Sequence, residues 1–195
     1  MYARLSIAAV FSMAALAACG TPPPAPVPLA APTTTTTADV PGADPVAWFE
    51  AYCGPMGVSA IASRQLQGVA AAGMAAAKES VVRWTTLAAA SHRQIADGVE
   101  KLGPLGSDVQ SMHERLVKQL RKDAEGFDRV TARLKALEAN DVFLERYQQA
   151  VAVEMGNAGE QATALFKQIA GTPTYAETFR TNKVCADWQA TARAK

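Results

Sequence analysis

Three cysteines and two histidines are the residues of this 195-residue chain best suited to nucleophilic or metal-binding chemistry. Zinc sites on helices commonly place two imidazoles on one face, as in an HExxH segment. His92 and His113 fall in different predicted helices, and neither has a second histidine four residues further on. We therefore interpret both as residues of solvated helix faces, and we predict no metal site and no cofactor.

Catalytic motifs are also missing from the sequence. Ser59 lacks the flanking glycines of a nucleophile elbow, and the segment Gly103-Pro104-Leu105-Gly106 lacks the lysine and the preceding strand of a phosphate-binding loop. The chain carries 19 Lys and Arg against 18 Asp and Glu, a net charge of +1, which gives no electrostatic basis for a nucleic-acid partner. We predict a protein that is not an enzyme, unless distant polar residues converge in one cleft.

Residues 1–18 have the pattern of an export signal. Arg4 precedes an uncharged, mainly apolar run from Leu5 to Ala18. A helix that crosses the hydrocarbon layer needs about 20 apolar residues, so this run is too short for a permanent membrane span. We expect the segment to be removed.

The export signal ends at Leu16-Ala17-Ala18-Cys19. This segment resembles the lipobox of bacterial lipoproteins, and the resemblance covers the first 19 residues only. It implies cleavage by signal peptidase II before Cys19 and attachment of diacylglycerol to the Cys19 thiol. The mature protein would then be anchored in the cell membrane by its acyl chains, on the extracytoplasmic face.

Ordinary secretion is the alternative, because Ala15-Leu16-Ala17 fits the small-x-small rule for cleavage after Ala17. Secretion would leave three cysteines, one of them unpaired, in an oxidising compartment. Lipidation of Cys19 leaves Cys53 and Cys185 as an even pair, so the cysteine count favours the lipobox.

Residues 19–43 form a predicted tether after the lipidated cysteine. The 24 residues from Gly20 to Ala43 include seven prolines and six threonines, a composition that cannot form a core. The threonine run Thr33–Thr37 is either a plain solvated linker or a site of O-glycosylation. The tether and the Ala-rich helices that follow are similar to small envelope lipoproteins of actinobacteria, a resemblance of composition and architecture that implies no activity.

Residues 44–195 read as an all-α domain. Asp44-Pro45 has the pattern of a helix start, and Gly54-Pro55 is predicted to end a short first helix. The segment Val58–Leu102 is predicted to be helical with a break near Gly73, followed by a stop at Gly103-Pro104.

The clearest helix follows, with apolar residues three or four apart from Val109 to Leu137 and a capping box of Ser107 with Gln110. A further helix is predicted from Val142 to Ile169, bent at Gly156 or Gly159. A last helix runs through Trp188, opened by a capping box of Thr174 with Glu177. We predict an antiparallel bundle of about four main helices with a short N-terminal helix.

Cys53 and Cys185 fall in the first and last predicted helices, and we predict that a disulfide joins them. Five aromatic residues lie near them in the sequence and form either a packed cap around the bridge or the lining of a ligand pocket; they are Trp48, Tyr52, Tyr175, Phe179 and Trp188. The charged run 121–135 is mixed in sign and reads as a solvated surface.

The sequence thus favours a lipid-anchored interaction or accessory protein of the cell envelope, with an envelope protein as a possible partner. A helical module that binds a lipid or small molecule in an apolar cavity is the alternative.

Overall fold

The computed structural model describes residues 42–193, which contain seven α-helices, two short 3-10 helices and no strand. The all-α fold class is therefore confirmed for the described part of the chain. The predicted export signal, the lipobox with Cys19 and nearly all of the tether lie outside the described residues. None of the helices in 42–193 combines the length and the apolar character of a membrane-spanning segment.

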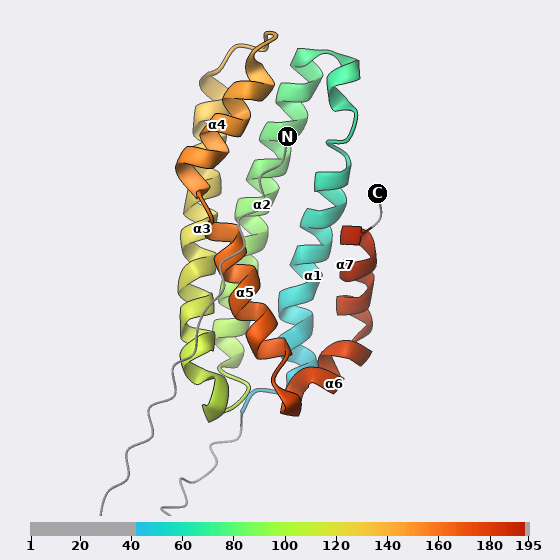
Figure 1. Cartoon of the computed structure of the whole chain (residues 1–195), viewed down its shortest axis with the longest axis vertical. Helices are drawn as coiled ribbons and strands as arrows, with labels where there is room; N and C mark the ends of the chain where they lie inside the picture. The colour runs from blue at the N-terminus through green and yellow to red at the C-terminus, as the bar shows by residue number, and fades with distance from the viewer. Residues whose placement is uncertain (1–41, 194–195) are drawn as a thin grey trace, which may run out of the picture. The chain divides into compact units, whose positions relative to one another are not determined.

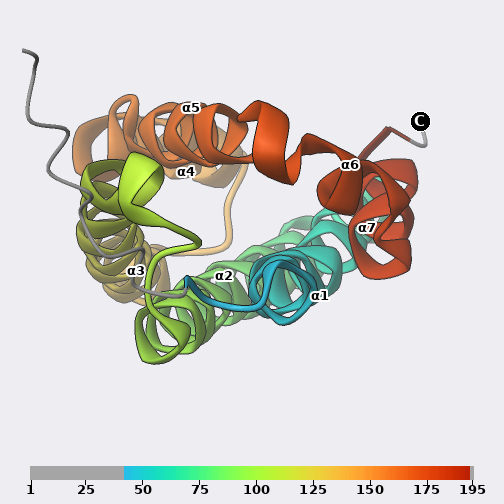
Figure 2. The ribbon, with the colours of Figure 1, turned by 90° about the horizontal axis from the view of Figure 1, so that it is seen from below.

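Three long helices lie side by side with alternating directions, and the remaining helices cover them (Figure 1). Seen from below, α1, α2 and α3 form one layer, α4 and α5 lie over the α3 side of it, and α6 and α7 close the α1 side (Figure 2). The helices are α1 Pro45–Arg64, α2 Met74–Leu102, α3 Gln110–Ala136, α4 Phe143–Met155, α5 Ala158–Ala170, α6 Pro173–Thr181 and α7 Lys183–Arg193; the 3-10 helices are η1 Val69–Ala72 and η2 Ser107–Val109.

The first helix is long, and the prediction that Gly54-Pro55 ends it is wrong. Asp44 caps it as expected, accepting hydrogen bonds from the backbone N–H groups of Val46 and Ala47, but the helix continues through Pro55 to Arg64. Packing against α2 and α7 holds the helix on both sides of the proline. Gly54 lies beside α7, where an added Cβ atom would be in ordinary contact with Val184 at 3.9 Å, so the glycine neither ends the helix nor is required by the packing.

The predicted breaks at Gly73 and in the segment 142–169 are confirmed. Gly68 (φ 72°), Gly73 (φ 96°) and Gly156 (φ 51°) adopt positive φ values, which favour glycine over residues with a Cβ atom. Gly68 and Gly73 lie at the two ends of η1, which connects α1 to α2. Gly156 separates α4 from α5, which selects one of the two positions predicted for the bend.

Both predicted capping boxes are wrong. Ser107 begins η2, and the N-cap of α3 is Val109, which makes no side-chain cap. Pro173 starts α6 two residues earlier than expected, so Thr172 takes the N-cap position without a side-chain bond. The last predicted helix is also divided, because the Asn182 side chain accepts a hydrogen bond from the Cys185 N–H at 3.1 Å and caps a separate α7.

The buried apolar side chains form two clusters at opposite ends of the bundle. We call the end where α1 begins and α2 ends the base; here Ala43 N–H donates to the Pro104 carbonyl oxygen at 2.9 Å. The base core contains 19 buried residues from six of the seven helices or their connections. The other end, which we call the far end, has a core of four buried residues: Val81, Val130, Leu134 and Phe143.

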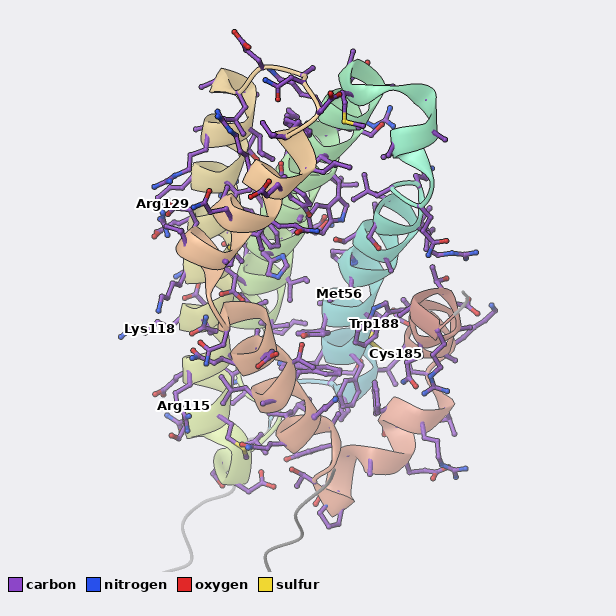
Figure 3. The ribbon with its side chains drawn as sticks, turned by 45° about the horizontal axis from the view of Figure 1, so that its top comes forward. Met56, Arg115, Lys118, Arg129, Cys185 and Trp188 are labelled. Carbon is purple, nitrogen blue, oxygen red and sulfur yellow. A yellow bond between two sulfur atoms is a disulfide. The ribbon has the colours of Figure 1, made fainter. Side chains whose placement is uncertain are left out.

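The predicted disulfide is confirmed in the base core. Cys53 of α1 and Cys185 of α7 are bonded, with their Cα atoms 5.0 Å apart, and both side chains are fully buried. The bridge joins the start of the bundle to its last helix across 132 positions of sequence. α7 is thereby fixed beside α1, near Met56 and Trp188 (Figure 3).

Candidate binding groove on α3

An open groove of about 910 Å³ runs over the outer face of α3, between α5 and the C-terminal end of α2. Its α3 side carries four cations, and its α5 side carries the amide side chains of Gln161 and Gln168. Glu100 of α2 lies at the other edge. The cations are Arg115, Lys118, Arg121 and Lys122.

The amphipathic sequence of α3 explains why these charges face outward. Leu116, Leu120, Val130 and Leu134 recur at helical spacing and are fully buried, which leaves the charged residues on the opposite face. α3 holds seven of the chain's 19 Lys and Arg but only four of its 18 Asp and Glu. The net charge of +1 therefore conceals a concentration of positive charge on one helix.

Several of the α3 cations are neutralised by ion pairs. Arg121 donates to the carboxylate of Glu100, with one N–O distance of 3.1 Å. Arg129 and Arg133 both bind Glu154 of α4, at 2.8 and 2.6 Å, and the hydrogen bond from Arg129 is the largest cause of the lowered pKa of that carboxyl.

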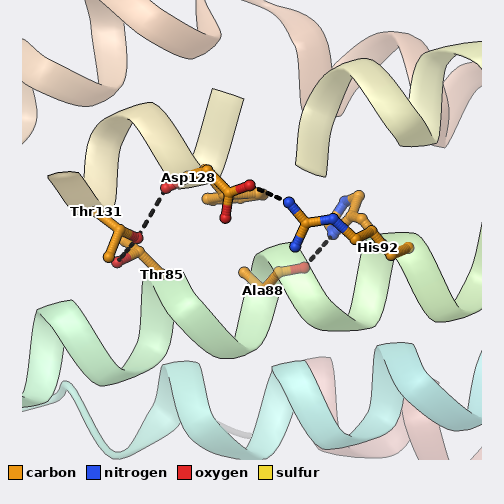
Figure 4. Close-up of polar contacts among 7 residues, drawn as sticks. Thr85, Ala88, His92, Asp128 and Thr131 are labelled. Atoms are coloured by element: carbon orange, nitrogen blue, oxygen red, sulfur yellow. Dashed lines mark hydrogen bonds and ion pairs between the residues drawn. The ribbon is translucent and has the colours of Figure 1, made fainter. Parts of the chain in front are cut away.

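An acidic side chain of α3 is also neutralised, by a cation of α2. Arg93 of α2 pairs with Asp128 of α3, close to the contact between the Thr85 and Thr131 hydroxyls (Figure 4). Arg115, Lys118 and Lys122 have no ion-pair partner among residues 42–193. Their spacing of three and four residues places them on one exposed face of α3.

His113 lies at the inner wall of the groove, and the interpretation of both histidines as solvated is wrong. The His113 ring is 5% exposed, packs 6.2 Å from the Trp48 ring, and its Nδ1 has no hydrogen-bond partner within the described part of the chain. Burial lowers the pKa of His113, against the opposing effects of Glu114 and Glu100, so the ring is neutral at pH 7.

His92 is also buried. It lies on α2, with its Nδ1 2.8 Å from the Ala88 carbonyl oxygen (Figure 4). Both histidines lie at helix positions that face the core, where their rings pack against aromatic side chains.

Behind the groove wall lies a buried carboxyl group that the sequence analysis placed on the solvated surface. Asp123 is 0% exposed; its Oδ1 accepts a hydrogen bond from Gln119 at 2.7 Å, whereas its Oδ2 has no partner within 42–193. Burial raises the pKa of Asp123 more than Gln119, His92 and Lys122 lower it. The signal was present in the sequence, since Asp123 follows Leu116 and Leu120 along the apolar stripe.

The aromatic residues near the disulfide form a packed cap, which confirms the first of the two predictions made for them. The Tyr52 ring is stacked 3.8 Å from the Phe166 ring, and the Trp188 ring lies 5.8 Å from Phe166. Phe166 of α5, which the sequence analysis did not connect with this group, lies at its centre. Burial, with a smaller contribution from Asp123, raises the pKa of Tyr52.

The described residues do not form a metal-binding site. Within 42–193 there is no group of three His, Cys, Asp or Glu side chains suited to hold a metal ion. The groove offers four cations, three carboxylates and several amide side chains along an open surface, and its cations without an ion-pair partner can bind anionic groups.

The comparisons add no relative. No protein-family model matches the chain, and no curated protein or solved structure matches it.

Proposed function

We propose that this protein is a lipid-anchored, extracytoplasmic protein of the cell envelope that acts as a non-enzymatic interaction module. The observation that carries the proposal is the pairing of Cys53 with Cys185. It uses two of the three cysteines, so that Cys19, the cysteine of the lipobox-like segment, is the one that the bridge does not use.

The compartment follows from the same pair. Disulfides persist in oxidising environments outside the cytosol, where thiol-reducing systems are absent. A structural bridge buried between α1 and α7 therefore supports export of the chain, which agrees with the export signal expected at residues 1–18.

The shape of the candidate site supports an interaction module over the alternative of a small-molecule carrier. A carrier would bind its ligand in an enclosed, mainly apolar cavity. The groove on α3 is open and lined largely by charged and amide side chains, while aromatic rings fill the base core between α1 and α5. Binding at an exposed face is the function that this arrangement supports best.

The test compares the wild-type chain with Cys19→Ser in a bacterial host that processes lipoproteins. We expect the wild-type chain to partition into the detergent phase and to begin at an acylated Cys19 by mass spectrometry. Cys19→Ser should remain uncleaved or be released in soluble form. As a control, the double variant Cys53→Ala/Cys185→Ala should keep its acyl chains.

Two outcomes would contradict the proposal. An N-terminus at Ala18 in the wild-type chain would establish ordinary secretion instead of lipidation. A Cys19→Ser variant with unchanged size and unchanged membrane retention would show that the thiol is not the anchor.

A further inference from the structure

We propose that Arg115, Lys118 and Lys122, which we call the basic row, dock α3 onto the anionic phospholipid headgroups of the membrane that holds the protein. The inference deepens the proposed function and rests on it, because the lipid anchor brings the bundle to that membrane. It assigns the groove on α3 a partner chemistry, namely the phosphate groups of a lipid surface.

Of the seven α3 cations, four have no ion-pair partner within 42–193; three of these lie together as the basic row, and the fourth, Lys135, lies at the other end of the helix. Arg121, Arg129 and Arg133 are held by acidic side chains of α2 or α4. The three side chains of the row are exposed, and Arg115 and Lys118 extend away from the bundle (Figure 3). They are therefore free to form charge-assisted hydrogen bonds with phosphate oxygens.

The acidic residues of α3 reduce the charge of the basic row but leave it positive. Asp123 is buried and Asp128 is paired with Arg93, which leaves Glu114 and Glu125 on the exposed face of the helix near the row. Glu114 accepts a hydrogen bond from the uncharged Gln110. The face keeps an excess of positive charge even though the chain as a whole is almost neutral.

The row lies on the N-terminal half of α3, and this half starts at the base of the bundle. The Ala43–Pro104 hydrogen bond fixes the beginning of the domain beside the turn that leads into α3. Arg115 is five residues after the start of α3 at Gln110. The row spans seven residues, about 10 Å at the rise of an α-helix, so its three charges can lie on one flat surface.

The groove adds neutral hydrogen-bond donors to these cations. The amide of Gln168 on α5 lines the side of the groove opposite the row, and its side chain makes no hydrogen bond within 42–193. Phosphate oxygens accept from both amide and ammonium groups. A headgroup in the groove would therefore meet donors from two helices.

The first experiment uses the lipidated chain in vesicles of phosphatidylcholine alone, or of phosphatidylcholine with about 30% phosphatidylglycerol. The anionic lipid gives the second vesicle a negative surface potential, as in a natural anionic leaflet at roughly −30 mV. Lysine acylation by an amine-reactive ester is followed for each residue by mass spectrometry. We expect several-fold protection of Lys118 and Lys122 by the anionic lipid, removed by high salt. Lys183 on α7 is the internal control and should react equally in both vesicles.

The second experiment does not depend on the anchor. The full chain carrying Cys19→Ser is sedimented with the same vesicles and compared with the same chain carrying R115Q, K118Q and K122Q. Each cation near an anionic surface contributes about 1 kcal/mol, so the triple variant should partition at least about tenfold more weakly. The matched control R64Q, R83Q and R193Q removes the same charge from α1, α2 and α7 and should bind like the parent.

The outcomes separate the two proposals. Equal binding of both triple variants, or equal acylation of Lys118 in both vesicles, would overturn the docking surface whether or not Cys19 is lipidated. Displacement from the vesicles by inorganic phosphate at constant ionic strength would also overturn it, since the row would then be a site for a soluble anion. Salt-sensitive selectivity of the unlipidated chain for phosphatidylglycerol, lost only in the first triple variant, would support it.

Discussion

The base and the far end of the bundle are built from the same long helices but are stabilised differently. At the base, 19 buried residues surround a disulfide and a group of stacked aromatic rings. At the far end, four buried side chains hold α2, α3 and α4 together, and the connection from α1 to α2 runs through exposed alanines. The comparison indicates that cooperative stability is concentrated at the base, where the described part of the chain begins.

The buried ionisable side chains follow the same division. The buried Asp123, His113 and Tyr52 all lie in or beside the base core. Groups of this kind are tolerated only where packing is strong enough to offset the cost of their burial. The basic row is presented by the same part of α3, so the best-stabilised half of the molecule also carries its candidate interaction surface.

Removal of the disulfide should have the largest effect on the base. The bridge closes a loop of 133 residues, counted from Cys53 to Cys185, for which chain entropy predicts a stabilisation of up to about 5 kcal/mol. We expect Cys53→Ala/Cys185→Ala to lower the free energy of unfolding by about 2–5 kcal/mol in urea titrations. The wild-type chain with reductant added is the matched control; a loss of less than about 1 kcal/mol would show that the base does not depend on its covalent link.

A pair of leucines on one helix tests the difference between the two cores directly. Leu120 belongs to the base core and Leu134 to the far-end core, and both are fully buried. Leu→Ala exchanges in cores cost about 2–5 kcal/mol, with the larger values where the surroundings cannot collapse into the cavity. We expect about 4 kcal/mol for Leu120→Ala and about 2 kcal/mol for Leu134→Ala by urea unfolding; the reverse order would contradict the comparison.

Gly106 tests a single contact at the base. A Cβ atom at this position would overlap the Tyr175 hydroxyl and come within 2.8 Å of the Asp108 carboxylate, the two groups that form a 2.9 Å hydrogen bond between α6 and η2. We expect Gly106→Ala to destabilise the fold by about 1–2 kcal/mol in thermal unfolding.

The control for Gly106 uses the same exchange in a Tyr175→Phe background. Because the hydroxyl is then absent, the added methyl group should cost less than in the wild-type chain. Equal costs in both backgrounds would mean that the strain arises elsewhere.

The smallest expected effect is a gain in stability. The pKa of Asp123 is raised in the folded chain, so folding is favoured when this carboxyl is protonated and is penalised as the pH rises through its folded-state pKa. Asp123→Asn removes this penalty and should stabilise the fold at neutral pH by about 1 kcal/mol, with the gain shrinking as the pH falls towards the pKa of an unfolded aspartate.

Thermal unfolding of Asp123→Asn at neutral and acidic pH provides the measurement. Asp141→Asn, at an exposed position before α4 that has no ion pair within 42–193, makes the same change in net charge and serves as the control. A stabilisation of Asp123→Asn that is independent of pH would show that ionisation of the carboxyl is not the cause.

The sequence predicts the helical class and the disulfide partners because both depend on local pattern and simple counting. The apolar period of α3 and the helix break at Gly73 can be recognised from the local sequence, without knowledge of the packing partners. Pro55 misleads because its cost is offset by contacts with α2 and α7 that no local pattern contains. Asp123 was assigned to the surface because neighbouring charges outweighed its position on the apolar stripe.

The basic row could not be identified from sequence because its distinguishing property is what the other cations contact. Ion pairs of Arg129 and Arg133 with Glu154, or of Arg93 with Asp128, join residues of different helices that are 21 to 35 positions apart. Only the packed structure separates paired from unpaired charges. The charged run 121–135, predicted to be a solvated surface of mixed sign, therefore divides into charges that are held in ion pairs and charges that are not.

The bridge between α1 and α7 also determines what happens when the backbone is cut. The segment from Gln65 to Gly73 carries exposed residues and two glycines, features that make it accessible to proteases. A nick there would separate α1 from the rest of the polypeptide, yet Cys53 would keep both fragments covalently joined through Cys185. Cleavage in this segment would thus leave the damaged molecule as one particle until a reductant separated its two fragments.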